Sequence, residues 1–503
     1  MKLHLPIVLL AVMSVSVAYA TGIAIPTSSI KVDNTVYTSK DSEVHNQLAA
    51  SAIGTSSHNP EVIVKDGAGE LVIDKDVTMN NQFRVREGTV TISGATVTNN
   101  MKLGGAEAAL SVGGTNANLV LDGGKYVQSA SANYGASFAL GNGDGAATVE
   151  LKNKSLLHSD HCLFLGRARI GAYVTPSYKD TSQGETYHEG YADGDLPTGL
   201  TKVTVSGKSE MSAGTALYLD HVELTITGEG TKVIDNTRGL YNSLVDPTLN
   251  YTSVFGGRNE STTIVKIEDG ASMSIQNNGL YVGTGDRNTT TITVSGKSEK
   301  GVSSSLSVEG TAYLGCSYGD TNSSSTTVLV KDGAVATFDD VVLGYYENKA
   351  ASIQVESATL NLNDIMWVGN DGSLSVDEAS TLGLALTSLG GGTAIMLTES
   401  AKLTIADGAT IVLTLSDAVI EALAAKGGAE VVEWNLFSGL TDDDTVGNVT
   451  VKTADAGYTL SNVNLSTQDG VVKLQATASI PEPTTATLSL LALAALAARR
   501  RRK

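Results

Sequence analysis

Hydrophobic and polar residues alternate in short stretches along most of the chain. Within Ile264–Gly283, three such stretches follow one another, and they are separated by Asp269-Gly270 and Asn278-Gly279. Alternation with a period of two is typical of β-strands, and Asx-Gly pairs are typical of tight turns. The inward positions of this unit are Val265 and Ile267, Met273 and Ile275, and Leu280 and Val282. The pattern therefore predicts three short strands and two turns within one repeat.

The unit recurs with loops of varying length. First-strand anchors at residues 265, 292, 328 and 353 lie 27, 36 and 25 positions apart, and the phrase TVSGKSE occurs at both 204–210 and 293–299. Further matching positions are Val149/Leu151 with Leu163/Leu165, Val203/Val205 with Leu217/Leu219, Ile292/Val294 with Leu306/Val308 and Ala312/Leu314, Val328/Val330 with Ala336/Phe338 and Val341/Leu343, and Ile353/Val355 with Leu360/Leu362 and Met366/Val368. The recurrence predicts stacked structural repeats.

Three strands in each repeat of about 25 residues predict one rung of a β-solenoid, because a single rung cannot bury its inward row of Val, Ile and Leu. The expected fold is all-β, a right-handed parallel β-helix, in line with the usual handedness of parallel crossovers. An antiparallel β-sandwich array is the alternative, but it favours blocks near 100 residues. The style of the repeats is loosely similar to the passenger regions of autotransporter-like surface proteins.

The pattern predicts the organisation of the mature body. Residues 61–412 are expected to form the solenoid, and residues 21–60 an N-terminal cap or a disordered segment. Residues 413–479 are expected to form a C-terminal cap, since an open solenoid end exposes strand edges and core. Within that cap, Asp417–Lys426 has the apolar spacing of a short helix ended by Gly427-Gly428. Strands are expected at Val431–Phe437, Gly447–Thr453 and Val471–Leu474.

The first 20 residues have the pattern of a secretory signal peptide. Lys2 supplies a positive start, Leu5–Val17 is apolar, and Ala18 and Ala20 form an A-x-A cleavage site. The sequence therefore predicts export, with removal of residues 1–20.

Residues 480–503 combine three features in a fixed order. Pro481, Glu482 and Pro483 exclude a regular helix before residue 484; the apolar run Ala486–Ala498 follows, and a basic cluster ends the chain. The cluster is Arg499, Arg500, Arg501, Arg502 and Lys503. Such a cluster is expected to stay on the cytoplasmic side of a bilayer. The 13-residue run spans roughly 20 Å as a helix, less than the hydrocarbon core of about 30 Å.

This tail resembles the PEP-CTERM sorting signal of Gram-negative bacteria. The resemblance implies recognition by an exosortase-type membrane enzyme, cleavage near Pro-Glu-Pro, and a transient stay of the tail in the inner membrane. It implies delivery to the cell envelope, the outer surface or the extracellular matrix. An ordinary tail anchor is the alternative for the same residues.

The charge of the mature body is strongly negative. Without the two terminal segments it keeps 28 basic and 52 acidic residues. A nucleic-acid partner is therefore not expected, because it needs clustered Lys and Arg. The two cysteines, Cys162 and Cys316, are too few for a disulfide-rich scaffold, and both a bond and two separate thiols stay open.

No strong catalytic constellation is present, and no catalytic or metal-binding residue is assigned. His158-Ser159-Asp160-His161-Cys162 resembles a metal-ligand cluster only weakly, since further ligands at zinc spacing are missing. A polar edge of one rung is the favoured interpretation. Gly141–Gly145 is expected to be a turn. Asp442-Asp443-Asp444 could hold calcium, but a solvated acidic loop explains it as well. No cofactor other than such a calcium ion is expected.

Two long excursions interrupt the repeats and are candidate binding loops. The first, between Gly166 and Val203, carries Tyr173, Tyr178, Tyr187 and Tyr191. The second, Gly239–Arg258, carries Tyr241, Tyr251 and Phe255. Aromatic side chains on loops of a rigid scaffold can stack on sugars or anchor a partner protein, although packing over the solenoid flank is the simpler alternative.

These patterns predict an exported structural or adhesin-like protein of the cell surface or matrix. By the resemblance of the tail, extracellular polysaccharide or a host glycan is an expected partner. The alternative is a carbohydrate-active enzyme, a polysaccharide lyase or hydrolase, on the same scaffold. Two or more carboxylates meeting Arg or Lys in one groove would favour the enzyme. A face of Ser, Thr and Asn would favour the structural role.

Overall fold

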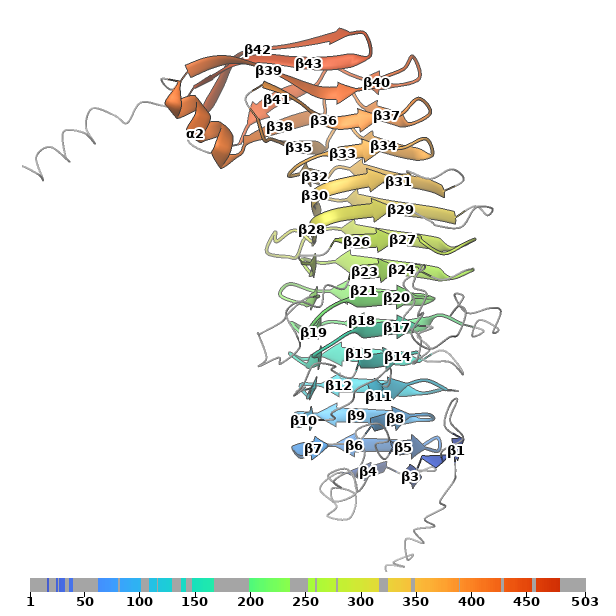
Figure 1. The fold of residues 1–503 in the computed structure, drawn as a ribbon. Helices are drawn as coiled ribbons and strands as arrows, with labels where there is room; N and C mark the ends of the chain where they lie inside the picture. Colours follow the sequence, from blue (N-terminus) through green and yellow to red (C-terminus); the bar gives the residue numbers. More distant parts are fainter. Residues whose placement is uncertain are drawn as a thin grey trace, which may run out of the picture.

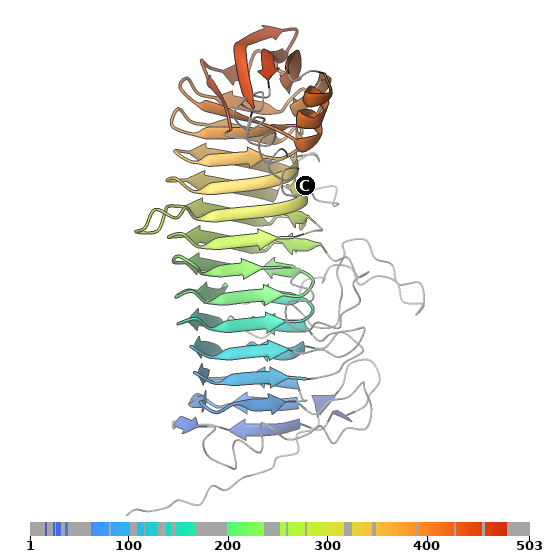
Figure 2. The same cartoon turned by 90° about the vertical axis from the view of Figure 1, so that its left-hand side faces the viewer.

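The computed structural model shows an all-β protein, with 64% strand and 3% helix. The structure describes residues 62–479 apart from 80–81, 101–107, 115, 129–136, 142–146, 167–198, 236–251, 258–259, 277–278, 316–323, 345–348, 389, 427–428 and 455–457, together with four short strands before residue 40. The chain coils into a long stack of rungs (Figures 1 and 2). The prediction of an all-β solenoid built from parallel strands is confirmed.

Each rung contributes one strand to each of three rows, and neighbours within a row pair in parallel. The first row is the 14-stranded sheet β4 (Val36–Thr38), β6 (Glu70–Ile73), β9 (Thr89–Ser93), β12 (Asn118–Asp122), β15 (Thr148–Lys152), β18 (Thr201–Val205), β21 (Val222–Thr227), β24 (Thr262–Glu268), β27 (Thr289–Ser295), β29 (Ser324–Lys331), β31 (Lys349–Glu356), β34 (Gly372–Val376), β37 (Lys402–Ile405) and β40 (Thr445–Val446).

The second row follows the first along the chain. It consists of β7 (Val77–Met79), β10 (Thr96–Asn99), β13 (Lys125–Gln128), β16 (Leu156–Ser159), β19 (Glu210–Ala213), β22 (Lys232–Ile234), β25 (Ser272–Ile275), the first halves of β28 (Ser305–Leu314) and β30 (Val335–Leu343), β32 (Thr359–Leu362), β35 (Thr381–Leu386), β38 (Thr410–Leu415) and β41 (Thr450–Thr453).

The third row completes each rung. It consists of β3 (Thr27–Lys31), β5 (Val62–Asp66), β8 (Gln82–Val85), β11 (Ala108–Val112), β14 (Ser137–Leu140), β17 (Leu163–Gly166), β20 (Leu217–Asp220), β23 (Ser253–Phe255), β26 (Leu280–Val282), the second halves of β28 and β30, β33 (Met366–Val368), β36 (Gly390–Leu397) and β39 (Ala429–Ser438). A separate pair, β1 (Ser16–Val17) and β2 (Ala24–Ile25), is antiparallel.

The core consists of aliphatic columns that run along the stack. In the first row, one column is aliphatic through twelve successive rungs, because the strands pair in register and every second side chain points inward. The column is Leu71, Val90, Leu119, Val149, Val203, Leu224, Val265, Ile292, Val328, Ile353, Leu374 and Leu403, all nearly fully buried. The inward positions predicted from the alternation at Val149, Val203, Val265, Ile292, Val328 and Ile353 are confirmed.

Glycines end many strands of the third row because the chain turns there with positive φ. Gly256 has φ 67° and Gly283 has φ 72°. A Cβ at these positions would lie 2.1 Å from Thr290 Oγ1 and 2.2 Å from Thr326 Oγ1, respectively. Both the backbone conformation and the close packing of the next rung therefore require glycine.

The C-terminal end departs from regular stacking. Helix α2 (Asp417–Ala425) begins after Ser416, whose Oγ accepts a hydrogen bond from Val419 N at 3.4 Å, and it buries Val419 and Leu423. β43 (Val471–Ser479) then pairs antiparallel with β39, and β42 (Thr459–Gln468) pairs antiparallel with β43. The predicted helix and the predicted strands of this region are confirmed. Among the residues placed by the structure, no helix has the length and apolar character needed to cross a bilayer.

Two details of the repeat assignment need correction. Phe255 is not part of an excursion, because it lies on β23 and is fully buried. The sequence prediction also missed the rung that starts with β21, whose first strand follows Asp220 after one residue. Its third strand comes only after the long stretch 236–251, so the regular spacing is lost. The cleavage positions Ala18 and Ala20 and the tail 480–503 lie outside the described residues.

Candidate functional site

The cluster His158-Ser159-Asp160-His161-Cys162 lies where β16 meets β17. His158 Nδ1 is 3.0 Å from Ser212 Oγ on the next rung, and His158 Nε2 is 3.6 Å from Asp160 Oδ1. Ser212, His158 and Asp160 are the three residue types of a catalytic Ser-His-Asp triad. All three side chains are fully buried, whereas a catalytic serine must reach its substrate. The arrangement is a buried polar network rather than the rung edge expected from the sequence.

The rest of this cluster forms further hydrogen bonds. His161 Nδ1 lies 3.2 Å from Ser137 Oγ, and Ser159 Oγ donates to the carbonyl of Cys162 at 2.9 Å. Cys162 Sγ lies 3.1 Å from Thr215 Oγ1. Within the part of the chain that the structure describes, no three His, Cys, Asp or Glu residues are arranged to hold a metal ion. The hydrogen bonds offset the cost of burying these polar groups.

β28, the last described strand before Cys316, lies far from Cys162 in the stack. Cys162 precedes β17, and Gly315, the residue before Cys316, follows β28. These two strands are four steps apart in the third row, about 19 Å at about 4.8 Å per step. The Cα atoms of a disulfide usually lie within about 7 Å. Cys316 itself lies outside the described residues.

The interior of the second row contains a polar column near the N-terminal half. Asn99, Gln128 and Ser159 occupy successive inward positions, and Asp235 follows further along. Asn99 Nδ2 donates to Tyr126 Oη at 2.9 Å and to the carbonyl of Ala109 at 3.3 Å. Burial raises the pKa of Tyr126, so its hydroxyl stays neutral. These groups form hydrogen bonds inside the core and are shielded from any substrate in solution.

Asp235 is the most perturbed carboxyl of this interior. It is 2% exposed and accepts hydrogen bonds from Ser253 Oγ and, at 2.6 Å, from Gln276 N. Burial raises its pKa to about 7, although both hydrogen bonds favour the charged form. The carboxyl therefore connects β22, β23 and β25. The sequence signal was weak, since a single Asp after a strand is an ordinary turn residue.

A column of apolar and aromatic side chains follows the outer face of the third row, and the sequence analysis missed it. Its members face outward at paired positions on successive rungs and are hereafter called the outer apolar column: Phe164, Tyr218, Val254, Tyr281, Tyr313, Val342, Trp367 and Met396. The Phe164 and Tyr218 rings stack at 4.8 Å, and those of Tyr281 and Tyr313 at 4.6 Å. Single aromatics at outward strand positions gave no signal, because their alignment depends on loop lengths.

Three carboxylates, hereafter the acidic cluster, lie beside this column at the bend of β30 and before β33: Asp339, Asp340 and Asp364. Asp339 accepts hydrogen bonds from Gly310 N at 2.9 Å and from Asn363 Nδ2 at 3.0 Å, and Asp340 accepts one from Ile365 N at 3.3 Å. Partial burial and then the charges of Asp340 and Asp339 raise the pKa of Asp364. Among the described residues, no Lys or Arg forms an ion pair with these three carboxylates.

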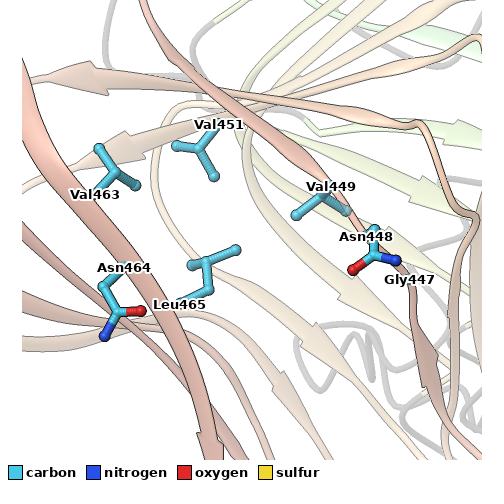
Figure 3. A pocket seen from close by; sticks show the side chains of 7 residues that line it. All are labelled: Gly447, Asn448, Val449, Val451, Val463, Asn464 and Leu465. Carbon is cyan, nitrogen blue, oxygen red and sulfur yellow. The ribbon is translucent and has the colours of Figure 1, made fainter.

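A recess of about 480 Å³ lies between β41 and β42 at the C-terminal end (Figure 3). Val449, Val451, Val463 and Leu465 line it, together with asparagines 448 and 464. Its lining has no titratable or nucleophilic side chain. It is an open recess of mixed polarity between the end of the second row and the β42–β43 hairpin.

The remaining sequence candidates divide into two groups. Asp444 accepts a hydrogen bond from Thr441 N in its own turn and one from Leu403 N on β37, both at 2.7 Å. Its neighbours Asp442 and Asp443 are exposed. The tyrosines of the first candidate loop, Tyr173, Tyr178, Tyr187 and Tyr191, lie outside the described residues. So do Tyr241, Tyr251 and residues 142–145 of the glycine-rich turn.

No protein-family model matches this chain, and no curated protein is significantly similar to it.

Proposed function

We propose that this protein is an exported β-solenoid with a structural or adhesin-like role at the cell surface or in the extracellular matrix of a Gram-negative bacterium. In this proposal, residues 1–20 direct export. Residues 480–503 are recognised by an exosortase-type enzyme while the tail is held transiently in the inner membrane. The solenoid is right-handed, as parallel crossovers generally are, and residues 413–479 cap it.

One observation carries the structural role over the enzymatic one. Outward positions of the first row between β27 and β34 are mainly hydroxyl side chains: Thr289, Thr291, Thr293, Ser295, Ser325, Thr327, Ser352, Ser373 and Ser375. Some charged groups of this row form partly exposed ion pairs, such as Lys266 with Glu223. Lys152 does contact two carboxylates, Asp122 at 3.9 Å and Glu150 at 3.5 Å, but these three side chains lie at outward positions of β12 and β15 and not in the recess near β41 and β42.

The buried Ser212–His158–Asp160 network does not support hydrolysis either. Its members are fully buried, and the recess of Figure 3 lies at the other end of the stack, near β41 and β42. A passive scaffold suits a long stack of rungs, because each added rung extends the surface without a new core. Extracellular polysaccharide or a host glycan is the proposed setting, on the strength of the resemblance of the tail alone.

The sorting proposal is tested by intact-mass analysis of the protein from membrane, surface and medium fractions. A mature product that begins near Thr21 and ends near Pro481 supports export with cleavage. A stable membrane pool that retains Lys503 contradicts it. A variant with Pro481→Ala and Pro483→Ala should accumulate uncleaved. Thr484→Ala, which leaves both prolines in place, is the matched control and should be processed normally.

The structural role is tested on the purified mature chain. Incubation with a panel of neutral and acidic polysaccharides should give no new reducing ends and no unsaturated products. The appearance of either product would favour the enzymatic alternative. Loss of that product in Ser212→Ala would then assign it to the buried network.

A further inference from the structure

Near the C-terminal end of the outer apolar column, large exposed apolar side chains lie next to one another. Ile365 and Trp367 lie at alternate positions of the same rung and are 40% and 43% exposed. Val342 and Met396 flank Trp367 on the rungs below and above. Large exposed side chains that gather on adjacent strands mark interaction surfaces more often than scattered ones do.

The size and the charge of this surface argue against a stable dimer of the chain. From Tyr281 to Met396 the column covers five rungs, about 19 Å at about 4.8 Å per step. With a width of about 10 Å, the strip covers on the order of 200 Å², well below the roughly 800 Å² per partner of a stable interface, so it suits a weak and transient contact. The excess of acidic residues would also make two copies repel each other.

The packing of the rings argues against a sugar chain stacked along the tyrosines. The rings of Tyr281 and Tyr313 are nearly parallel, with an interplanar angle of 7° and centroids 4.6 Å apart. Their faces are therefore directed toward each other. A pyranose ring needs an exposed aromatic face, whereas stacking covers one face of each ring, and Val254 and Val342 occupy the paired positions on the other side.

The charges beside Trp367 favour a cation. Asp340 and Ile365 occupy paired positions on β30 and just before β33, and Asp339 accepts a hydrogen bond from the Asn363 side chain. Mutual repulsion among the three carboxylates contributes to the raised pKa of Asp364. A cation near them would relieve this repulsion, and indole is the best aromatic partner for a cation.

We infer that Ile365, Trp367 and the acidic cluster form a docking surface for a protein partner that presents a lysine or arginine next to an apolar residue. The cation would lie between the indole ring and the carboxylates of Asp340 and Asp364. The apolar residue would cover Ile365. This inference is independent of the export route and of the structural role proposed above.

The test is a titration of the full chain with an acetylated and amidated peptide of alternating lysine and leucine. Trp367 fluorescence reports binding, since the other tryptophan, Trp434, is only 2% exposed. We expect weak binding that falls as sodium chloride is raised from about 50 to about 200 mM. A peptide of alternating glutamate and leucine should not bind. A flat salt response, or equal binding of both peptides, overturns the inference.

Variants locate the site. Trp367→Ala should weaken binding about two- to fivefold, the range of an exposed cation–π contact, with Phe at this position in between. Peptide binding to Trp367→Ala is measured by calorimetry, because this variant lacks the indole ring whose fluorescence reports binding. Asp340→Asn with Asp364→Asn should weaken binding and reduce its salt dependence. The matched control is Asp442→Asn with Asp443→Asn, which removes two exposed carboxylates elsewhere.

Two outcomes would assign the surface to another occupant and overturn the inference. Binding of cellohexaose that is lost in Trp367→Ala would indicate a neutral glycan. Self-association that is lost in the same variant would indicate a second copy. An equal loss of peptide binding in the control pair and in the Asp340/Asp364 pair would also overturn it, because it would show general charge attraction only. Circular dichroism of each variant confirms that the solenoid is intact.

Discussion

The two halves of the second row bury different chemistry at the same structural position. In the N-terminal half, the inward column contains Asn99, Gln128, Ser159, Ala213 and Asp235; in the C-terminal half it contains Ile275, Val308, Phe338, Leu362, Leu384 and Leu413. The backbone stacking is the same in both. An apolar column is stabilised by any well-fitting neighbour, whereas a polar column needs specific partners.

The difference teaches how a solenoid can accommodate irregular loops. Asp235 connects the strands on either side of residues 236–251, since Ser253 follows shortly after that stretch. In the C-terminal half, rungs follow at short intervals, and the inward column is held by aliphatic and aromatic packing. Buried hydrogen bonds are therefore found where long loops interrupt the rungs. Packed apolar side chains are found where the rungs follow one another regularly.

The largest effect is expected from a cavity in the apolar half. Phe338→Ala removes a fully buried ring, so the free energy of unfolding should fall by about 3–5 kcal/mol. Urea denaturation followed by circular dichroism measures it. Thr337→Ala, the adjacent outward residue, is the control and should change stability by less than about 0.5 kcal/mol. Similar losses for both variants would contradict the assignment of this column to the core.

A second effect on stability is expected at glycines that turn the chain with positive φ in the C-terminal half of the stack. Gly283→Ala combines positive φ with a contact of the new Cβ at 2.2 Å from Thr326 Oγ1. Gly296→Ala has φ +75 but nothing within 4 Å of the new Cβ. The strain alone should cost about 1 kcal/mol at Gly296, and Gly283 should cost clearly more. Equal losses in thermal denaturation would show that the close packing of rungs does not matter.

In the polar N-terminal half of the second row, stability should depend on hydrogen-bonded pairs of side chains rather than on single side chains. Asn99→Leu leaves the buried hydroxyl of Tyr126 without its donor and should cost about 1–3 kcal/mol. Combining it with Tyr126→Phe should recover part of that loss. A double-mutant cycle in urea measures the coupling. If the losses in stability of the two single variants simply add up, the hydrogen bond contributes nothing. A double-mutant cycle on Ile275 and Val308 serves as the apolar comparison.

The last effect is seen in the pH dependence of stability and concerns Asp235. Its folded pKa of about 7 lies above the ordinary 3.8, so between these values the folded state keeps a proton that the unfolded state releases. Stability should therefore be fully present below about pH 4, fall as the pH rises to about 7, and level off above it. Asp235→Asn should flatten this part of the curve. Hydrogen exchange of β22, β23 and β25 measures it locally, and an unchanged slope in the variant would contradict the assignment.

Much of the fold could be predicted from the sequence because the rungs are local. Period-two alternation and Asx-Gly turns identified the strands of Ile264–Gly283 and their inward residues. The prediction was wrong where a strand was short and followed a long interruption, as at Phe255. It also placed His158 and Asp160 at an exposed edge, since alternation within one strand does not reveal what covers its outer face.

The sequence by itself determined the parallel-rung architecture, the core positions and the short helix Asp417–Lys426, because strand, turn and helix signals each lie within a few residues. Only the tertiary structure decided which outward residues meet. Phe164 lies beside Tyr218, 54 positions away, and Trp367 lies between Val342 and Met396. Loop lengths vary from rung to rung, so no fixed spacing in the sequence marks these neighbours. The outer apolar column and its acidic neighbours therefore become visible only when the rungs are stacked.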